Sequence, residues 1–303
     1  MSQKGKKRRY DYSLLTAVFL LVGIGLVILY STSAYNGEVK FHDSFYYLKK
    51  QAFATILGII LMFVMANIDY HIWQYFAVFA YIIALILSTA VLFIGDEYNG
   101  SKRWLSLGPF SFQPSEYAKV ALILFLSYIV MKNVKEIDKV RTLIKIIAST
   151  LPIVALVGSN NLSTAVIILG IAIILIFVSS PKYTQFITMG ILAVGFLGIF
   201  LALESYRLER LAIWRNPEKY EKGYQTLQGL YAIGSGGLFG RGLGSSIQKL
   251  GFVPEAQNDM IFSIICEELG LFGAIFIIIL FVILIWRFFV IAVHAKDLFG
   301  ALI

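Results

Sequence analysis

The composition of this 303-residue chain excludes an ordinary water-soluble protein. Hydrophobic residues make up 58% of the sequence and charged residues only 15%, with a formal net charge of +8. Soluble proteins carry about 25% charged residues, so this chain has more apolar surface than a soluble core can hide. We therefore expect an integral membrane protein whose main solvent is membrane lipid, and we expect no nucleic-acid partner.

Eight apolar runs predict helices that cross a bilayer. A hydrocarbon core of about 30 Å needs about 20 helical residues at about 1.5 Å per residue, whereas spanning strands would be half as long and would alternate. The runs predict an all-α, polytopic transmembrane bundle that forms one domain over residues 1–303. In chain order they are Leu14–Tyr35, Gln51–Ile68, Ile72–Ile94, Tyr117–Met131, Leu143–Val157, Ser163–Ser179, Phe186–Leu203 and Phe262–Ala292.

The basic residues predict the orientation of these spans. Lys and Arg near the ends of spans stay on the cytoplasmic side, so the basic cluster within residues 4–9 places the N-terminus inside. Counting spans from there also places inside the basic residues of 132–145, Lys182, Arg287 and Lys296. The segments expected outside are 36–50, 95–116, 158–162 and a long loop, 204–259.

Basic side chains in two outward segments have two interpretations. Arg215 and Lys249 lie in the long loop, and Arg103 lies in an earlier outward segment. A long loop tolerates Lys and Arg outside without any function. Alternatively, these cations bind an anionic group such as a diphosphate, for which Arg and Lys are the usual ligands.

A glycine-rich segment, Gly234–Ser246, lies within the long loop. Both nucleotide-binding patterns fail there, because Leu243 stands where the Walker motif needs lysine and Phe239 where the dinucleotide fingerprint needs its last glycine. The segment instead predicts backbone that another group approaches closely, either a packed helix or a ligand.

Two carboxylates precede the last apolar run. If the turn after Pro254 is helical, Glu255 and Asp259 share one face at the outer boundary of the membrane. A carboxylate there loses hydration and becomes a better proton acceptor; the alternative is that both acids simply cap a helix N-terminus. Glu267 and Glu268 fall inside the run, where ionisable residues face a cavity or a partner.

A further pair of charges begins the fourth run. Glu116 and Lys119 are spaced to form an ion pair on one helix face, either as a plain helix-start pair or as part of a site. The three histidines are scattered and Cys266 is the single cysteine, so we expect no zinc site.

Taken together, these motifs resemble the SEDS family of shape, elongation, division and sporulation proteins, the FtsW, RodA and SpoVE group. The Pro-Glu-Ala form of the last motif is more similar to the FtsW and SpoVE branch. Members have about ten spans, so the resemblance implies that one or two C-terminal spans are missing from the eight found here. The resemblance is carried by Asn99–Trp104, Gln113–Lys119, Gly223–Gln228, Ala232–Gly237, Pro254–Phe262 and Glu267–Gly270.

One motif departs from the family pattern. Many members have Gln-Pro-Asp-Leu-Gly before the sixth span, where this chain has Ser-Asn-Asn-Leu-Ser over residues 159–163. A role of the family aspartate is therefore not transferred to Asn161.

The resemblance implies a peptidoglycan glycosyltransferase of the bacterial cytoplasmic membrane, active in cell-wall biogenesis, cell shape and cell division. Such enzymes polymerise lipid II at the outer face, release undecaprenyl diphosphate and work with a class B penicillin-binding protein. By resemblance Asp259 is the essential residue, and we assign it the role of general base. These residues identify no cofactor with certainty, and a divalent cation (Mg²⁺ or Mn²⁺) is compatible with them. The expected substrate-binding residues are Arg103, Glu116, Lys119, Arg215, Lys249 and Glu255.

Two other functions remain open. A lipid II flippase needs polar residues through the depth of the bilayer, whereas here they gather at the outer end, which favours the enzyme. A membrane scaffold that only recruits the penicillin-binding protein predicts that Asp259 is dispensable.

Overall fold

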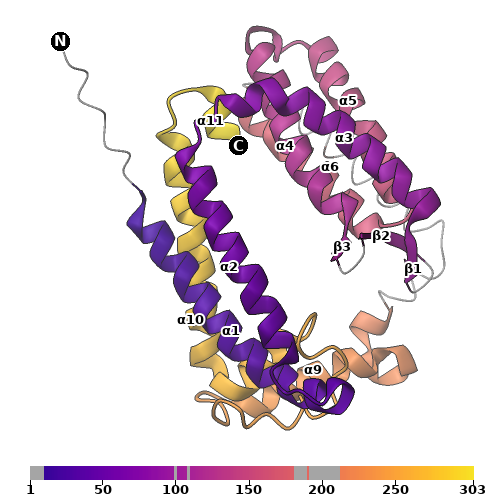
Figure 1. The fold of residues 1–303 in the computed structure, drawn as a ribbon, viewed down its shortest axis with the longest axis vertical. Coiled ribbons are helices and arrows are strands. Elements are labelled where there is room, and N and C mark those ends of the chain that lie inside the picture. The colour runs from indigo at the N-terminus through magenta and orange to yellow at the C-terminus, as the bar shows by residue number, and fades with distance from the viewer. Residues whose placement is uncertain (1–9, 99–100, 108–109, 181–189, 191–211) are drawn as a thin grey trace. The chain divides into compact units, whose positions relative to one another are not determined.

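The computed structural model describes residues 10–98, 101–107, 110–180, 190 and 212–303. Within these residues, seven helices are long and apolar enough to cross a membrane. They coincide with seven of the eight predicted runs, which confirms the helical membrane architecture (Figure 1). The remaining run, Phe186–Leu203, lies outside the described residues apart from residue 190. The seven are α1 (Tyr12–Phe41), α2 (Tyr46–Asn67), α3 (Ile72–Ile94), α4 (Pro114–Lys132), α5 (Val140–Gly158), α6 (Leu162–Ser179) and α10 (Ile261–Val293).

Shorter elements lie between and after these helices. The long outward loop contains α9 (Tyr224–Gly236), which follows the 3-10 turns η2 (Pro217–Lys219) and η3 (Glu221–Gly223). The turn η1 (Val134–Glu136) joins α4 to α5, and α11 (Leu298–Leu302) follows α10.

The outward segment 95–116 contains strands, which the all-α prediction overlooked. Strands β1 (Asp96–Tyr98), β2 (Ser101–Leu107) and β3 (Phe110–Phe112) form an antiparallel sheet in the order β1-β2-β3. Strands this short lack the sustained alternation by which a sequence reveals a strand. The sheet therefore adds a small β element to a helical protein.

The segment 36–50, which was predicted to lie outside, is mostly helical. Helix α1 continues to Phe41 and ends at His42, whose N–H bonds the carbonyl of Glu38 at 3.0 Å. Its 30 residues span about 45 Å, longer than a bilayer core of about 30 Å. Hydropathy located the apolar part of α1 but not the polar turns beyond it.

Contacts divide the chain into two compact units, which are described separately. One contains residues 68–197 and 291–303, and the other contains residues 1–67 and 198–290. We call them the α3–α6 unit and the α1–α10 unit. The prediction of one membrane domain over the whole chain stays a prediction.

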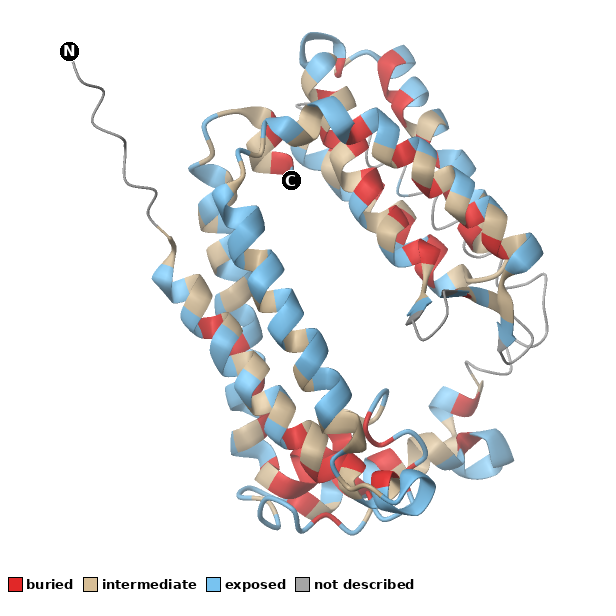
Figure 2. Cartoon of the chain, viewed as in Figure 1, coloured by how far each residue is buried: buried red, intermediate tan, exposed pale blue. Residues whose placement is uncertain are grey.

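The α3–α6 unit has a packed apolar core. Small residues on neighbouring helices, such as Ala84 on α3 and Ala121 on α4, are fully buried and allow close approach of the helices. Tyr81 stacks on Phe125 with ring centroids 4.1 Å apart. Figure 2 shows buried and exposed positions alternating along the helices of this unit. Exposed apolar residues such as Phe79 and Ile86 of α3 are those expected to contact lipid.

Helices α1, α2 and α10 of the α1–α10 unit run side by side (Figure 1). At one end Arg287 of α10 forms an ion pair with Asp11, which holds the pKa of that carboxyl below its ordinary value. The start of α1 and the end of α10 therefore lie together, as the predicted alternation of spans requires. Which end faces the cytoplasm stays a prediction.

Helix α10 is interrupted at Gly270, whose φ of 66° and ψ of −167° are not helical. The glycine-rich segment lies against this break. The N–H of Arg241 donates to the carbonyl of Glu267 at 2.9 Å, and the N–H of Gly242 donates to that of Glu268 at 3.0 Å. In an unbroken helix these two carbonyls would accept hydrogen bonds from the N–H groups of Leu271 and Phe272. The loop supplies the hydrogen bonds that the break removes.

The loop also accepts the hydrogen bonds of the next two N–H groups in α10. Leu271 donates to the carbonyl of Gly237 at 3.0 Å, and Phe272 donates to that of Leu238 at 3.2 Å. Of the two interpretations of the glycine-rich segment, close packing against a helix is the one that the structure shows.

We predict that Gly240→Ala destabilises this junction. A Cβ at Gly240 would lie 2.2 Å from the backbone oxygen of Glu268, and φ is +79°. Clash and backbone strain together should cost at least about 2 kcal/mol. Gly244→Ala is the matched control, because φ is +82° there but nothing lies within 4 Å. Thermal unfolding in detergent measures both, and an equal loss in the two variants would contradict the packing argument.

In the α3–α6 unit, side chains from the α2–α3 turn meet Asp297 before α11. Tyr70 donates to Asp297 Oδ2 at 2.6 Å, which raises the pKa of Tyr70 to about 12 and lowers that of Asp297. His71 bonds Asp69 at 2.6 Å and Asp297 at 3.0 Å. The Asp69 hydrogen bond is the main cause that raises the pKa of His71.

We predict a pH-dependent contribution of His71 to stability. Because its pKa is raised in the folded state, the contribution is complete below the unfolded value of about 6.5 and is lost as the pH rises through the folded value. Wild type should therefore exceed His71→Gln in melting temperature more at acidic than at alkaline pH. His42→Asn is the control, because the described residues contain no ion pair of the His42 side chain. A difference independent of pH would contradict the prediction.

Candidate active site

The turn that carries Glu255 and Asp259 is not helical. Residues 254–260 form turns, and α10 begins only at Ile261. Glu255 has a φ of 52°, in the left-handed region. The prediction that both carboxylates share one helical face is therefore wrong, because the left-handed residue turns the chain before the helix starts. Both side chains are exposed.

Hydrogen bonds hold this turn in shape from two sides. Asn258 Nδ2 donates to Glu255 Oε2 at 2.6 Å within the turn. Asn36 Nδ2 of α1 donates to Gln257 Oε1 at 3.0 Å, and Gln257 is buried. Asp259 is thus an exposed carboxylate two residues after Gln257, which is hydrogen-bonded to α1.

An apolar cluster packs against the turn. It joins α9 and the first turn of α10 to the chain just before Asp259, so the exposed carboxylate lies on a packed base. The cluster consists of Ala232, Val253, Ala256 and Ile264, with Met260 packed against it.

Lys249 lies inside the α1–α10 unit rather than facing outward as its predicted role in binding an anion requires. Only 6% of Lys249 is exposed. Its Nζ contacts Glu268 Oε1 at 2.7 Å and Ser31 Oγ at 2.9 Å. Ser31 donates in turn to the Glu268 carboxylate at 2.7 Å. The ammonium is therefore committed to a buried carboxylate of α10.

The neighbouring carboxylate, Glu267, is bound by the same short segment. Ser246 Oγ donates to Glu267 Oε2 at 2.5 Å, and the N–H of Ile247 donates to Oε1 at 3.2 Å. Arg241 Nη1 lies 3.7 Å from Oε1. The prediction that both glutamates of the last run face a partner is confirmed, and the partners come from 241–249 and α1.

Arg215 lies exposed on the surface of the α1–α10 unit. It lies at the end of a helical stretch, 212–215, that precedes η2. Its role in binding substrate stays a prediction.

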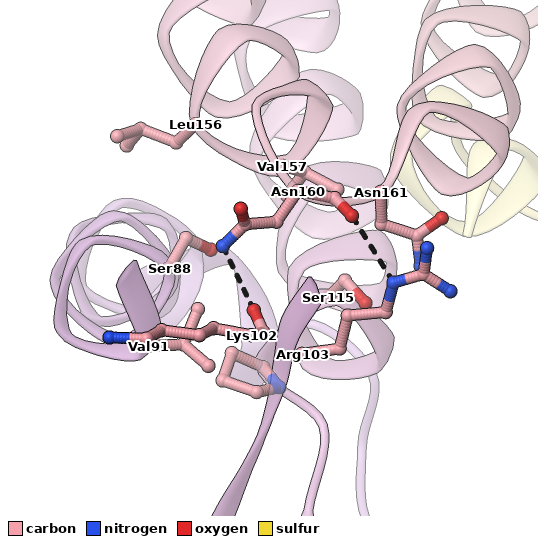
Figure 3. A pocket seen from close by; sticks show the side chains of 10 residues that line it. Ser88, Val91, Lys102, Arg103, Ser115, Leu156, Val157, Asn160 and Asn161 are labelled. Carbon is pink, nitrogen blue, oxygen red and sulfur yellow. Dashed lines mark hydrogen bonds between the residues drawn. The ribbon is translucent and has the colours of Figure 1, made fainter. Parts of the chain in front are cut away.

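In the α3–α6 unit, Arg103 projects from β2 beside the α5–α6 turn. Its Nε donates to the backbone carbonyl of Asn160 at 3.1 Å, and Asn160 Nδ2 donates to the carbonyl of Lys102 at 2.9 Å. Figure 3 shows these two bonds at the rim of a small pocket with Ser88 and Ser115 on its walls. Asn160 thus anchors the strand that carries Arg103.

Helix α4 presents the third charged feature. Pro114 occupies its first turn, where the absent N–H is no loss. The expected ion pair is present, with Lys119 Nζ 2.8 Å from Glu116 Oε2. A role of this pair in binding substrate stays a prediction.

The predicted residues therefore fall into two groups, each within its own unit. Asp259, Glu255 and Arg215 are exposed in the α1–α10 unit, with Lys249 buried in the same unit. Arg103, Glu116 and Lys119 belong to the α3–α6 unit.

Sequence reasoning missed the residues that hold these groups in place. Ser31, Asn36 and Asn160 are polar residues whose partners lie far away in the chain, so no spacing identified them. One signal was present: Ser31 opens a polar triplet inside an otherwise apolar run.

Among the described residues, no three or more His, Cys, Asp or Glu side chains lie together so that they could hold a metal ion. A divalent cation at the site stays a prediction.

Asn161, the position of the family aspartate, caps α6. Its Oδ1 accepts from the N–H of Thr164 at 3.2 Å, and the residue precedes the first helical position, Leu162. Asn and Asp are both strong N-cap residues. The departure from the family motif thus preserves the capping interaction.

We predict that Asn161→Asp folds as stably as wild type, whereas Asn161→Ala loses about 1 kcal/mol because the cap is removed. Thermal unfolding in detergent compares the two variants. Ser159→Ala is a control in the same turn, outside the cap. A loss in Asn161→Asp equal to that in Asn161→Ala would show that the residue does more than cap the helix.

Several known proteins are similar to this chain over nearly its whole length. The family model of FtsW, RodA and SpoVE, described as "Cell cycle protein", matches residues 12–303. Stage V sporulation protein E of Bacillus subtilis is 38% identical over 98% of this chain and 83% of its own length. A probable peptidoglycan glycosyltransferase FtsW of Geobacter sp. is 34% identical over 96% of this chain and 81% of its own.

Solved structures show the same fold. A chain from the study "Structural coordination of polymerization and crosslinking by a peptidoglycan synthase complex" is 26% identical, with a TM-score of 0.77 over 97% of this chain and 81% of that chain. RodA of Thermus thermophilus is 26% identical, with a TM-score of 0.69 over 98% of this chain and 79% of its own.

Seven apolar helices and these relatives make the chain a multi-pass integral protein of the cytoplasmic membrane. Since the family model covers nearly the whole chain and a curated relative exceeds 30% identity, the chain belongs to the FtsW, RodA and SpoVE (SEDS) family.

Proposed function

We propose that this protein is a peptidoglycan glycosyltransferase that polymerises lipid II into glycan strands at the outer face of the cytoplasmic membrane. Relatives matched over almost the whole chain are named probable peptidoglycan glycosyltransferases. The observation that carries the proposal is the exposed carboxylate of Asp259. It lies on a turn that packs on an apolar cluster and is hydrogen-bonded to α1. A reacting base needs both access to substrate and a fixed position.

In the proposed reaction, Asp259 accepts the proton of the sugar 4-hydroxyl of one lipid II. The oxygen forms a bond to the anomeric carbon of the growing strand, and the bond from that carbon to the diphosphate oxygen breaks. Undecaprenyl diphosphate leaves from the opposite face, so the configuration inverts. One carboxylate base is enough, because a diphosphate is already a good leaving group.

Charge develops on the leaving diphosphate and has to be balanced by cations aimed at it. We assign this role to Arg215, which is exposed in the same unit as Asp259, and in that unit Glu255 would orient the sugar by hydrogen bonds. For Arg103, Glu116 and Lys119 of the α3–α6 unit, we keep contact with the lipid II headgroup as a separate proposal. We remove Lys249 from this set, because its ammonium already neutralises Glu268.

A divalent cation, Mg²⁺ or Mn²⁺, is left as an optional addition. Such an ion would take part of its coordination from substrate phosphates, as Mg²⁺ commonly does. The proposed reaction does not depend on it.

We also propose a class B penicillin-binding protein as partner. One solved relative comes from a peptidoglycan synthase complex that couples polymerisation to crosslinking. A partner that crosslinks strands as they are made fits a polymerase in the same membrane.

We predict that Asp259→Ala and Asp259→Asn lower the polymerisation rate about 10²- to 10⁴-fold, the usual contribution of a general base. Purified protein with its partner is incubated with labelled lipid II, and glycan strands are separated by length. Asp138→Asn, in the loop between α4 and α5, is the matched control.

Partner binding and thermal unfolding are measured for the same variants. Undiminished polymer from a folded Asp259→Ala would exclude Asp259 as the base and favour the scaffold. Transport of lipid II across vesicles without any polymer would favour the flippase.

A further inference from the structure

We propose that Lys249 is a positioning residue for Asp259. Together with Ser31 of α1, it neutralises Glu268 and so fixes the first turns of α10, at whose N-terminus Asp259 lies. The inference rests on the proposed role of Asp259 and deepens it, because it names what holds the base in place.

The charges of this group are fully enclosed. Glu268 is 0% exposed and Lys249 is 6% exposed. Removing a carboxylate from water is costly unless a countercharge and hydrogen bonds replace the water. Lys249 supplies the countercharge at 2.7 Å, and Ser31 donates to both carboxylate oxygens at 2.7 and 2.8 Å. A lysine in this position has no access to a substrate in solution or at the membrane surface.

The first turns of α10 need such an anchor because the helix is interrupted. Gly270 is non-helical, so residues 261–269 are not continued by an unbroken helix. Beside the apolar cluster shared with α9, the polar contacts that hold them come from the segment 241–249 and α1. Ser246 binds Glu267 and Lys249 binds Glu268, so two adjacent carboxylates are fixed by residues three positions apart.

Helix α1 then joins the anchor to the turn of Asp259. Ser31 contacts Glu268, and further along the same helix Asn36 donates to Gln257 at 3.0 Å. Asp259 lies between these two contact points in the sequence. A rigid helix that is bound at both points holds the intervening backbone at a fixed distance from itself, so movement of Glu268 is transmitted to Asp259.

The test is a double-mutant cycle on Lys249 and Glu268 in the full-length protein with its partner. Lys249→Met leaves a buried carboxylate unpaired, and we expect kcat for lipid II polymerisation to fall about 10²-fold, as a misplacement of about 1 Å does. KM should stay within about twofold, because the lysine does not touch substrate in this proposal. Lys249→Met with Glu268→Met should regain most of kcat, because an apolar pair of similar volume often replaces a buried ion pair without loss.

Two further variants keep the outcome interpretable if Lys249→Met folds poorly. Ser31→Ala retains the ion pair but removes the hydroxyl link to α1, so it should lower kcat with little change in unfolding temperature. Lys135→Met, on an exposed lysine of the α4–α5 loop, controls for loss of a lysine and should behave as wild type.

A direct readout of position uses spin labels at Glu38 and Phe262, both exposed, after Cys266→Ala. The distance between the labels should be narrowly distributed in wild type and in the double variant, and broad in Lys249→Met. This measurement does not need the enzyme to be active, so it still tests the positioning if the proposed polymerase activity fails.

Two results would overturn the proposal. The first is a double variant as inactive as Lys249→Met, with a raised KM, which would return Lys249 to the substrate-binding set. The second is an unchanged label distance in Lys249→Met, which would mean that the ion pair does not control the turn.

Discussion

Backbone groups inside a membrane protein have to be satisfied by the protein, because lipid offers them no hydrogen bonds. The break of α10 at Gly270 is where this constraint is most demanding here. Two carbonyls and two N–H groups lose their helical partners, and the glycine-rich segment supplies all four replacements. The loop has to approach closely to do so, which explains why Gly240 and Gly270 lack room for a Cβ.

The same break concentrates buried charge. Glu267 and Glu268 immediately precede it and are both 0% exposed. Their cost of burial is offset by groups that reach them from outside α10, namely Arg241, Ser246, the N–H of Ile247, Lys249 and Ser31. The buried acids of the interrupted helix therefore hold the loop and α1 together through hydrogen bonds and an ion pair. The turn that carries Asp259 directly precedes this helix.

Much of the fold was predictable from the sequence because hydropathy acts locally. A run such as Ile72–Ile94 is apolar throughout, and the observed α3 has the same bounds. No such local signal marks the polar turns of α1 beyond residue 35, the short strands or α9. These elements were therefore not predicted from the sequence. Helix boundaries and small sheets depend on capping and on tertiary pairing, which periodicity does not report.

The residues assigned to the candidate site stay a prediction, and the residues that hold them in place were not predicted. Family motifs selected Asp259, Arg103 and the Glu116–Lys119 pair, and the structure shows Asp259 and Arg103 exposed and the ion pair formed. Ser31 and Asn160 act across more than fifty residues of sequence, where no spacing rule applies. Lys249 was assigned from its position in an outward loop, and a loop residue can fold inward.

The contrast between Lys249 and Arg215 separates two uses of positive charge in one loop. Arg215 is exposed, so its charge is screened by water and free to meet an anion. Lys249 is buried, and its ammonium forms an ion pair with a carboxylate that would otherwise have no countercharge. A substrate anion would have to displace Glu268 to reach it, leaving two buried charges without partners. Lys249 is therefore a partner of Glu268 inside the α1–α10 unit rather than a ligand of a substrate anion.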